Sequence, residues 1–284
     1  MTRPAPLFII GAPRSGNTLT RRVMMASGQI YIPPETYVIG EIISRWPRWR
    51  RLSWREKVWM VCAYFDRHDH RADFEIESFT PFAREVEKLP EDQQTLPQLF
   101  DELYSFMARS HGFTEARWGD KTPWNTMHLK AIVKSFPDAY FLHLKRHGLD
   151  VVASQMKADM RDFTGSAERW VNANDACLTH LKRARRAPLS IAYEDLVSEP
   201  ERIFREIFGW ADLDFAPEHL TTVPEKLADV GRHAHHAAVT RPITPNSIGK
   251  WKASLEPEDL ASLPDGFDAM MDRLGYSPVR ATAE

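Results

Sequence analysis

The sequence predicts an α/β protein in which a parallel sheet is covered by helices on both faces. Two observations support this class. Short apolar runs that suit buried strands occur at residues 7–10 and 139–144, and PLSIAYEDL at 188–196 looks like a strand with a turn. A helical pattern follows each of them, over 18–27, 149–160 and 200–210. Strands that alternate with helices pair in parallel through crossover connections, and such sheets bind ligands beyond the carboxyl ends of their strands.

The remaining elements are expected from weaker patterns. A second short strand is predicted at 29–32, before Pro33 and Pro34. Residues 41–115 lack Val/Ile strand runs and carry several amphipathic segments, so we expect a helical insertion after the second strand. A further helix is predicted over 166–186, and the tail from 211 is loop-rich as far as 257–263. We expect residues 1–284 to form a single domain.

Composition excludes several classes of protein. The 284 residues are 43% hydrophobic and 27% charged, which is an ordinary globular balance. A formal net charge of −2 gives no general attraction to nucleic acid or membranes. The two cysteines, Cys62 and Cys177, form neither a zinc motif nor a disulfide framework. No run of 18 apolar residues occurs, and the N-terminal apolar run is too short for a signal peptide, so we expect a cytoplasmic protein.

The stretch GAPRSGNTLT, residues 11–20, has the glycine spacing of a phosphate-binding loop. Gly11 and Gly16 allow close backbone approach, and amides at the start of the following helix attract an anion. A nucleoside-triphosphate site would also need a lysine at position 17, where Asn17 stands, and an acidic Mg²⁺ ligand. The loop therefore favours an anion that needs no metal. An ordinary tight strand–helix turn is the alternative.

A second strand–turn–helix layout occurs in HLKRHGLDVVAS, residues 143–154. Arg146 ends the strand and Ser154 lies early in the helix, so the two side chains are suited to grip one phosphate. Alternatively, Arg146 pairs with Asp150. Taken together, the two loops predict a ligand with two separated anionic ends.

These segments resemble the sulfotransferases that use 3′-phosphoadenosine 5′-phosphosulfate (PAPS). PLFIIGAPRSGNTLT is similar to their 5′-phosphosulfate loop, and YFLHLKRHGLDVVASQM is similar to their 3′-phosphate segment. GDKTP at 119–123, YEDL at 193–196 and SIGKW at 247–251 follow in the expected order. The resemblance implies a P-loop-like sheet and PAPS as co-substrate, with no metal. It implies a donor site formed by Arg14, Ser15, Gly16, Asn17, Thr18, Leu19, Arg146, Ser154, Tyr193, Gly249 and Lys250.

The sequence departs from the family pattern in two places. Asn17 stands where threonine is usual, and its amide can still donate a hydrogen bond. Ala192 stands where many relatives carry arginine, which leaves the role of that strand end open.

The resemblance also implies the catalytic groups. Arg14 and Lys121 would stabilise the transferring sulfuryl group and the leaving oxygen. Small-molecule sulfotransferases have a histidine after Lys-Thr, but here Pro123 follows, so the branch with a glutamate base fits better and Glu35 in PPETYVIGE is the candidate. Glu41 is the second choice.

Each of these assignments has a structural alternative. Glu35 could be a turn residue or a partner of Arg14 or Arg21, and Lys121 could pair with Asp120 or Asp150.

Two further stretches have more than one interpretation. Residues 45–59 mix tryptophans with arginines, which suits contact with a glycan or a lipid headgroup. Alternatively, these residues form a helical lid with core tryptophans and solvated arginines. His233, His235 and His236 lack carboxylate or cysteine neighbours at ligand spacing, so we expect no metal there.

The leading functional hypothesis is transfer of the PAPS sulfuryl group to an acceptor hydroxyl on a carbohydrate, lipid or small molecule. We expect residues 41–115 and 211–247 to form the acceptor pocket. One alternative is a nucleotide-dependent phosphotransferase on a related loop. The other is a non-catalytic nucleotide-binding protein.

Overall fold

A five-stranded parallel sheet forms the centre of the computed structural model, which describes residues 4–114, 116–224 and 239–280. The strand order is β2-β3-β1-β4-β5. The strands are β1 (Leu7–Gly11), β2 (Ile30–Tyr31), β3 (Arg117–Lys121), β4 (Tyr140–Lys145) and β5 (Leu189–Ala192). The α/β class with a parallel sheet flanked by helices is confirmed.

Strand β1 is the central strand, and all five of its residues are buried. Such burial explains the continuous apolar run LFIIG, because a parallel strand is covered on both faces. Ile9 pairs with Lys121 of β3, and Gly11 pairs with Leu144 of β4. The loops that follow β1, β3 and β4 therefore leave the same edge of the sheet side by side.

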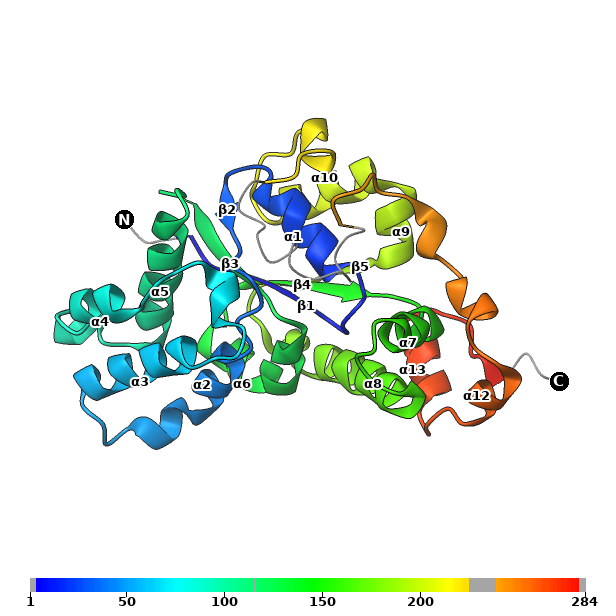
Figure 1. Ribbon diagram of the computed structural model, residues 1–284, viewed down its shortest axis with the longest axis horizontal. Coiled ribbons are helices and arrows are strands. Elements are labelled where there is room, and N and C mark those ends of the chain that lie inside the picture. The colour runs from blue at the N-terminus through cyan, green and yellow to red at the C-terminus, as the bar shows by residue number, and fades with distance from the viewer. Residues whose placement is uncertain (1–3, 115, 225–238, 281–284) are drawn as a thin grey trace.

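Helices cover both faces of the sheet (Figure 1). In this view α1, α9 and α10 lie on one side of the sheet, and α6, α7, α8 and α13 lie on the other. Among the described residues, the α-helices outside the segment between β2 and β3 are α1 (Asn17–Met25), α6 (Leu129–Ser135), α7 (Gly148–Lys157), α8 (Phe163–His180), α9 (Tyr193–Ser198), α10 (Pro200–Trp210), α12 (Pro257–Ala261) and α13 (Phe267–Arg273).

Four helices fill the segment between β2 and β3, where the sequence predicts a helical insertion. They are α2 (Ile39–Arg45), α3 (Trp54–Asp66), α4 (Thr80–Val86) and α5 (Leu96–Ser110). Ser53 caps α3 in a capping box with Glu56, and Thr95 caps α5. Trp118 of β3 stacks on Tyr104 of α5, which ties this segment to the sheet.

The structure differs from the sequence prediction at three places. The pattern RWGDK predicts no strand, but it forms β3, with Asp120 and Lys121 fully buried. Residues 193–198 form α9 where a turn was expected. Helix α13, which the pattern does not predict, packs Phe267 against Trp170 of α8.

Two smaller expectations concern the cysteines and the membrane. Cys62 and Cys177 are both free and buried. Among the described residues, no helix combines the length and the apolar character needed to cross a bilayer.

His143 of β4 makes the stability of this fold depend on pH. Burial lowers the pKa of His143 from 6.5 to about 4, although a hydrogen bond to Asn174 opposes the shift. The unfolded chain therefore binds a proton at this imidazole below about pH 6.5, whereas the folded chain binds it only near pH 4. We expect this group alone to lower the free energy of unfolding by up to about 3 kcal/mol between these pH values.

Urea denaturation of the wild type and His143→Gln across pH 7 to pH 4 measures this effect. The variant should lose less stability than the wild type over that range. Parallel pH curves for the two proteins would contradict the prediction.

Candidate active site

The loop between β1 and α1 is arranged to expose backbone amides. Gly16 caps α1 with a φ of 90°, and no side chain caps the helix there. Thr20 N donates to Gly16 O at 3.0 Å, so the amides before it belong to the first turn and have no acceptor within the helix. Arg14 has a φ of 68°, which is uncommon for a side chain larger than glycine. This strained loop places a cation beside the positive end of α1.

Two polar side chains of the loop behave differently. Ser15 is fully buried, and within the described chain its Oγ has no hydrogen-bond partner. An unsatisfied buried hydroxyl is costly, and the Ser15 O–H can donate a hydrogen bond to an anion held by the loop. Asn17 Nδ2 instead donates to Ala12 O at 2.9 Å. Asn17 occupies the position where a triphosphate site has its lysine, and here its side chain bonds to the backbone of the loop instead.

The glycines of the loop permit close contacts. A Cβ on Gly11 would lie 2.3 Å from Leu144 O of the neighbouring strand. A Cβ on Gly16 would lie 2.9 Å from the Tyr193 ring, so Tyr193 packs directly against the loop.

The two arginines predicted from the sequence lie together at the carboxyl edge. Arg146 Nη1 donates to Arg14 O at 2.8 Å, and Arg14 Nε donates to Ser154 Oγ at 3.1 Å. The Arg146 guanidinium lies 4.2 Å from the centroid of the Tyr193 ring. Burial, followed by the charge of Arg146, lowers the pKa of Arg14. Arg146 therefore adds positive charge beside the backbone of the first loop, which favours an anion at this edge of the sheet.

Arg146 does not pair with Asp150, which was the alternative interpretation of Arg146. The two Asp150 carboxylate oxygens accept from Gly249 N at 2.7 Å and from Trp251 N at 3.1 Å. Arg146 Nη2 donates to Ser247 O at 2.7 Å. Segment 247–251 is thus held beside Arg146, and Lys250 follows Gly249 at the start of a short 3-10 helix. The sequence analysis missed this role of Asp150, although the match of SIGKW pointed to the segment that it holds.

Lys121 and Glu35 form an ion pair at the end of β3. Lys121 Nζ lies 2.6 Å from Glu35 Oε1 and donates to Thr18 Oγ1 at 3.3 Å. The Lys121 side chain is fully buried, whereas the Glu35 side chain is 20% exposed. Lys121 therefore pairs with neither Asp120 nor Asp150. Glu41, the second candidate base, pairs with Arg45 on the surface of α2.

The other sequence candidates take less direct positions. Leu19 is half-buried in α1 and packs against the core. Trp49 and Trp54 of the segment 45–59 are buried, as a lid with core tryptophans would have them. His233, His235 and His236 lie outside the described residues. Within the described ranges, no three His, Cys, Asp or Glu side chains cluster in a way that could hold a metal.

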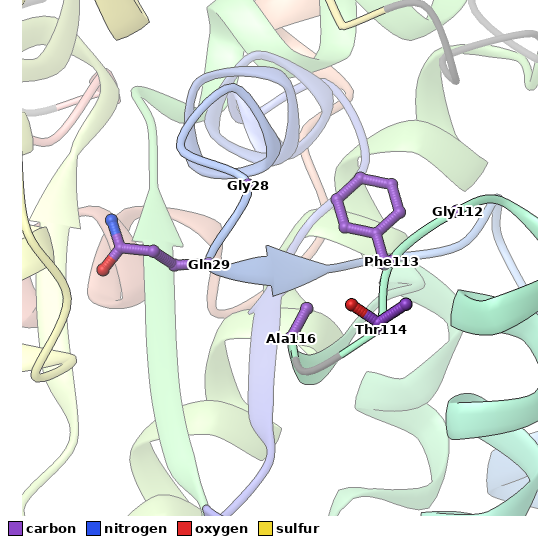
Figure 2. A pocket seen from close by; sticks show the side chains of 6 residues that line it. All are labelled: Gly28, Gln29, Gly112, Phe113, Thr114 and Ala116. Carbon is purple, nitrogen blue, oxygen red and sulfur yellow. The ribbon is translucent and has the colours of Figure 1, made fainter.

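Two hollows on the surface of the described residues lie away from this edge. The pocket in Figure 2 is lined by Gly28, Gln29, Gly112, Phe113, Thr114 and Ala116. These residues precede β2 and β3, so the pocket lies at the amino edge of the sheet. A second hollow is lined by residues of α3 and the loop after it, including Trp59 and Arg71. The carboxyl edge is where the charged groups converge, and ligands of such sheets bind there.

Comparison with known proteins agrees with this arrangement. A model of the sulfotransferase family matches residues 6–217, and the chain belongs to this family. It is a transferase that moves a sulfuryl group to an acceptor. The family implies PAPS as the sulfate donor and an acceptor substrate.

Several curated relatives are similar over nearly the whole chain. Protein-tyrosine sulfotransferase A of Caenorhabditis elegans is 25% identical over 288 residues, covering 96% of this chain and 67% of the relative. Protein-tyrosine sulfotransferase 1 of Danio rerio is 25% identical, covering 96% and 72%. Mouse carbohydrate sulfotransferase 4 is 33% identical over 99 residues, covering 34% of this chain and 25% of the relative.

Solved structures show the same fold. The sulfotransferase domain of the Synechococcus PCC 7002 olefin synthase superposes with a TM-score of 0.67 at 21% identity, covering 98% of both chains. The sulfotransferase domain of the curacin biosynthetic pathway gives a TM-score of 0.67 at 19% identity, covering 98% of this chain and all of that one.

The contact between β1 and β4 at Gly11 predicts a loss of stability on substitution. Gly11→Ala forces a methyl group against Leu144 O, so the strands must separate, and we expect a loss of about 1–3 kcal/mol. Gly209→Ala is the matched control, because Gly209 is helical with open space around it, and it should gain about 0.5–1 kcal/mol. Urea denaturation measures both, and a Gly11→Ala protein as stable as the wild type would show that the strands separate freely.

Proposed function

We propose that the carboxyl edge of the sheet binds PAPS with its two anionic ends on the two loops. The amides of residues 15–19 and the Ser15 hydroxyl would hold the 5′ end. Arg146, Ser154 and the segment at Gly249 and Lys250 would hold the 3′-phosphate. The single observation that carries the proposal is the fully buried Ser15 hydroxyl, which has no hydrogen-bond partner among the described residues and lies in the loop to which Arg146 donates. Tyr193, which packs against both the loop and Arg146, would lie beside the adenine.

The residues around the sulfur would act by charge and by proton transfer. When bound, PAPS supplies the activated sulfuryl group. We propose that Arg14 and Lys121 stabilise the negative charge that develops as this group moves, which is the largest contribution such sites make. Glu35 would accept the proton of the acceptor hydroxyl, since its carboxylate is partly exposed and lies beside Lys121.

A phosphotransferase fits these residues less well. Besides the missing lysine, the acidic side chain at the end of β3 is already engaged. Asp120 accepts hydrogen bonds from Thr36, Tyr104 and Asn125 and is fully buried, so it is not placed to hold Mg²⁺. A non-catalytic protein would have no need of the Glu35–Lys121 pair at this position.

The acceptor is proposed to carry a hydroxyl group and to bind against the helices between β2 and β3 and the segment 211–247. The curated relatives include protein-tyrosine and carbohydrate sulfotransferases. A tyrosyl phenol and a sugar hydroxyl are therefore the first acceptors to assay.

Binding of the desulfated donor tests the two-ended site. Adenosine 3′,5′-bisphosphate without metal, at about 100 times its Kd, should stabilise the protein by about 2.7 kcal/mol and raise Tm by roughly 5 °C or more. Arg146→Ala should weaken binding at least about 10-fold, because a charge-assisted contact is lost. Arg48→Ala, at an exposed position, is the control and should bind normally. Stabilisation by ATP with Mg²⁺, but not by the bisphosphate, would instead favour the phosphotransferase.

Replacement of Glu35 tests the base. Glu35→Gln should retain the bisphosphate affinity and reduce turnover at least about 100-fold, because the amide cannot accept the proton. Transfer of labelled sulfate to a tyrosyl or sugar acceptor measures the rate. Glu41→Gln is the matched control, since Glu41 pairs with Arg45 away from Lys121. Normal turnover by Glu35→Gln would place the base at another residue.

A further inference from the structure

Thr36 follows the proposed base directly, and its side chain belongs to a buried polar cluster. The cluster consists of Thr36, Tyr104, Asp120, Thr122 and Asn125. We infer that Asp120, acting through Thr36, is a positioning residue that fixes Glu35 against Lys121. This inference rests on the proposed role of Glu35.

The Asp120 carboxylate is the centre of the cluster. Oδ2 accepts from Thr36 Oγ1 at 2.9 Å and from the Tyr104 hydroxyl at 2.6 Å, and Oδ1 accepts from Asn125 Nδ2 at 2.6 Å. Asp120 is fully buried, so its charge has no contact with water. A buried carboxylate needs its oxygens satisfied, and here three donors converge on it.

The strand geometry gives Asp120 and Lys121 of β3 different partners. Successive side chains of a strand point to opposite faces, so Asp120 and Lys121 point apart. Lys121 reaches Thr18 and Glu35, whereas Asp120 reaches Tyr104 of α5. The cluster therefore lies on the face of β3 opposite the Lys121 side chain, and Asp120 does not pair with Lys121.

Thr36 is held by the two residues that flank Lys121. Its Oγ1 donates to Asp120, and its backbone N donates to Thr122 Oγ1 at 3.0 Å. The peptide that carries Glu35 is thus attached to the same strand end that carries Lys121. Because both contacts are buried, they restrict the relative position of the carboxylate and the ammonium group.

Tyr104 connects this cluster to the helical segment between β2 and β3. Burial, followed by the nearby Asp120 charge, raises the pKa of Tyr104 well above its usual value, so the phenol stays protonated and donates. Burial also raises the pKa of Asp120, and hydrogen bonds from Tyr104 and Thr36 oppose that shift. The helices that we propose to contact the acceptor are therefore linked to the base through α5.

Thr36→Val tests the inference, because it removes the hydroxyl and keeps the size and the backbone hydrogen bond. A displacement of a catalytic group by about 1 Å can cost about 100-fold in rate, so we expect kcat to fall about 10- to 100-fold. KM for PAPS and the affinity for the bisphosphate should stay within about twofold. Thr36→Ser keeps a hydroxyl within reach of Asp120 and should restore most of kcat.

A double-mutant cycle with Glu35→Gln separates positioning from other effects. If Thr36 acts through Glu35, the double variant should be no slower than Glu35→Gln alone. Additive losses, or full activity of Thr36→Val beside a slow Glu35→Gln, would overturn the positioning role and leave the proposed base intact. Full activity of Glu35→Gln would overturn both.

A second variant guards against a folding defect. Tyr104→Phe removes a different donor from the same carboxylate, and we expect kcat to fall about 3- to 10-fold with unchanged bisphosphate affinity. If Thr36→Val does not fold, the cycle is run with Tyr104→Phe and judged by the same outcomes.

Discussion

The pairing of β1 with β4 is the constraint on which the site depends. Gly11 lies beside Leu144, so the loop after β1 and the residue after β4 start from neighbouring positions. The close approach of the two strands at this point leaves no room for a side chain at residue 11. Arg14 and Arg146 meet as a consequence, although 131 residues separate them in the chain, and their like charges stay together because the sheet holds their backbones.

The charged groups at this edge form two sets, one of two cations and one of a cation with an anion. Arg14 and Arg146 bring two positive charges to the first loop, where burial, followed by the charge of Arg146, lowers the pKa of Arg14. The Lys121 and Glu35 pair is balanced and lies where β3 ends. A donor with two anionic ends and a neutral hydroxyl acceptor would suit such a division, since the first set attracts negative charge and the second can exchange a proton.

The sequence predicted the parts of this arrangement that local patterns encode. The apolar run of β1, the glycine loop and the D-V-V-x-S helix are local, and all three lie where expected. Strand β3 escaped prediction because RWGDK has charged residues whose partners, Tyr104 and Glu35, come from distant segments. The roles of Asp150 and Thr36 were missed for the same reason, since each depends on an acceptor or donor that only the fold brings near.

The hydrogen bonds from Gly249 N and Trp251 N to Asp150 affect which residues a functional fragment of the chain must contain. The family model matches only residues 6–217, yet the segment at 247–251 lies against Arg146 and α7. A boundary drawn from the family match would therefore cut away the segment that lies against Arg146 at the proposed donor site. The smallest fragment worth expressing must extend past Trp251, and it should include α13, because Phe267 packs on the helix that carries Trp170.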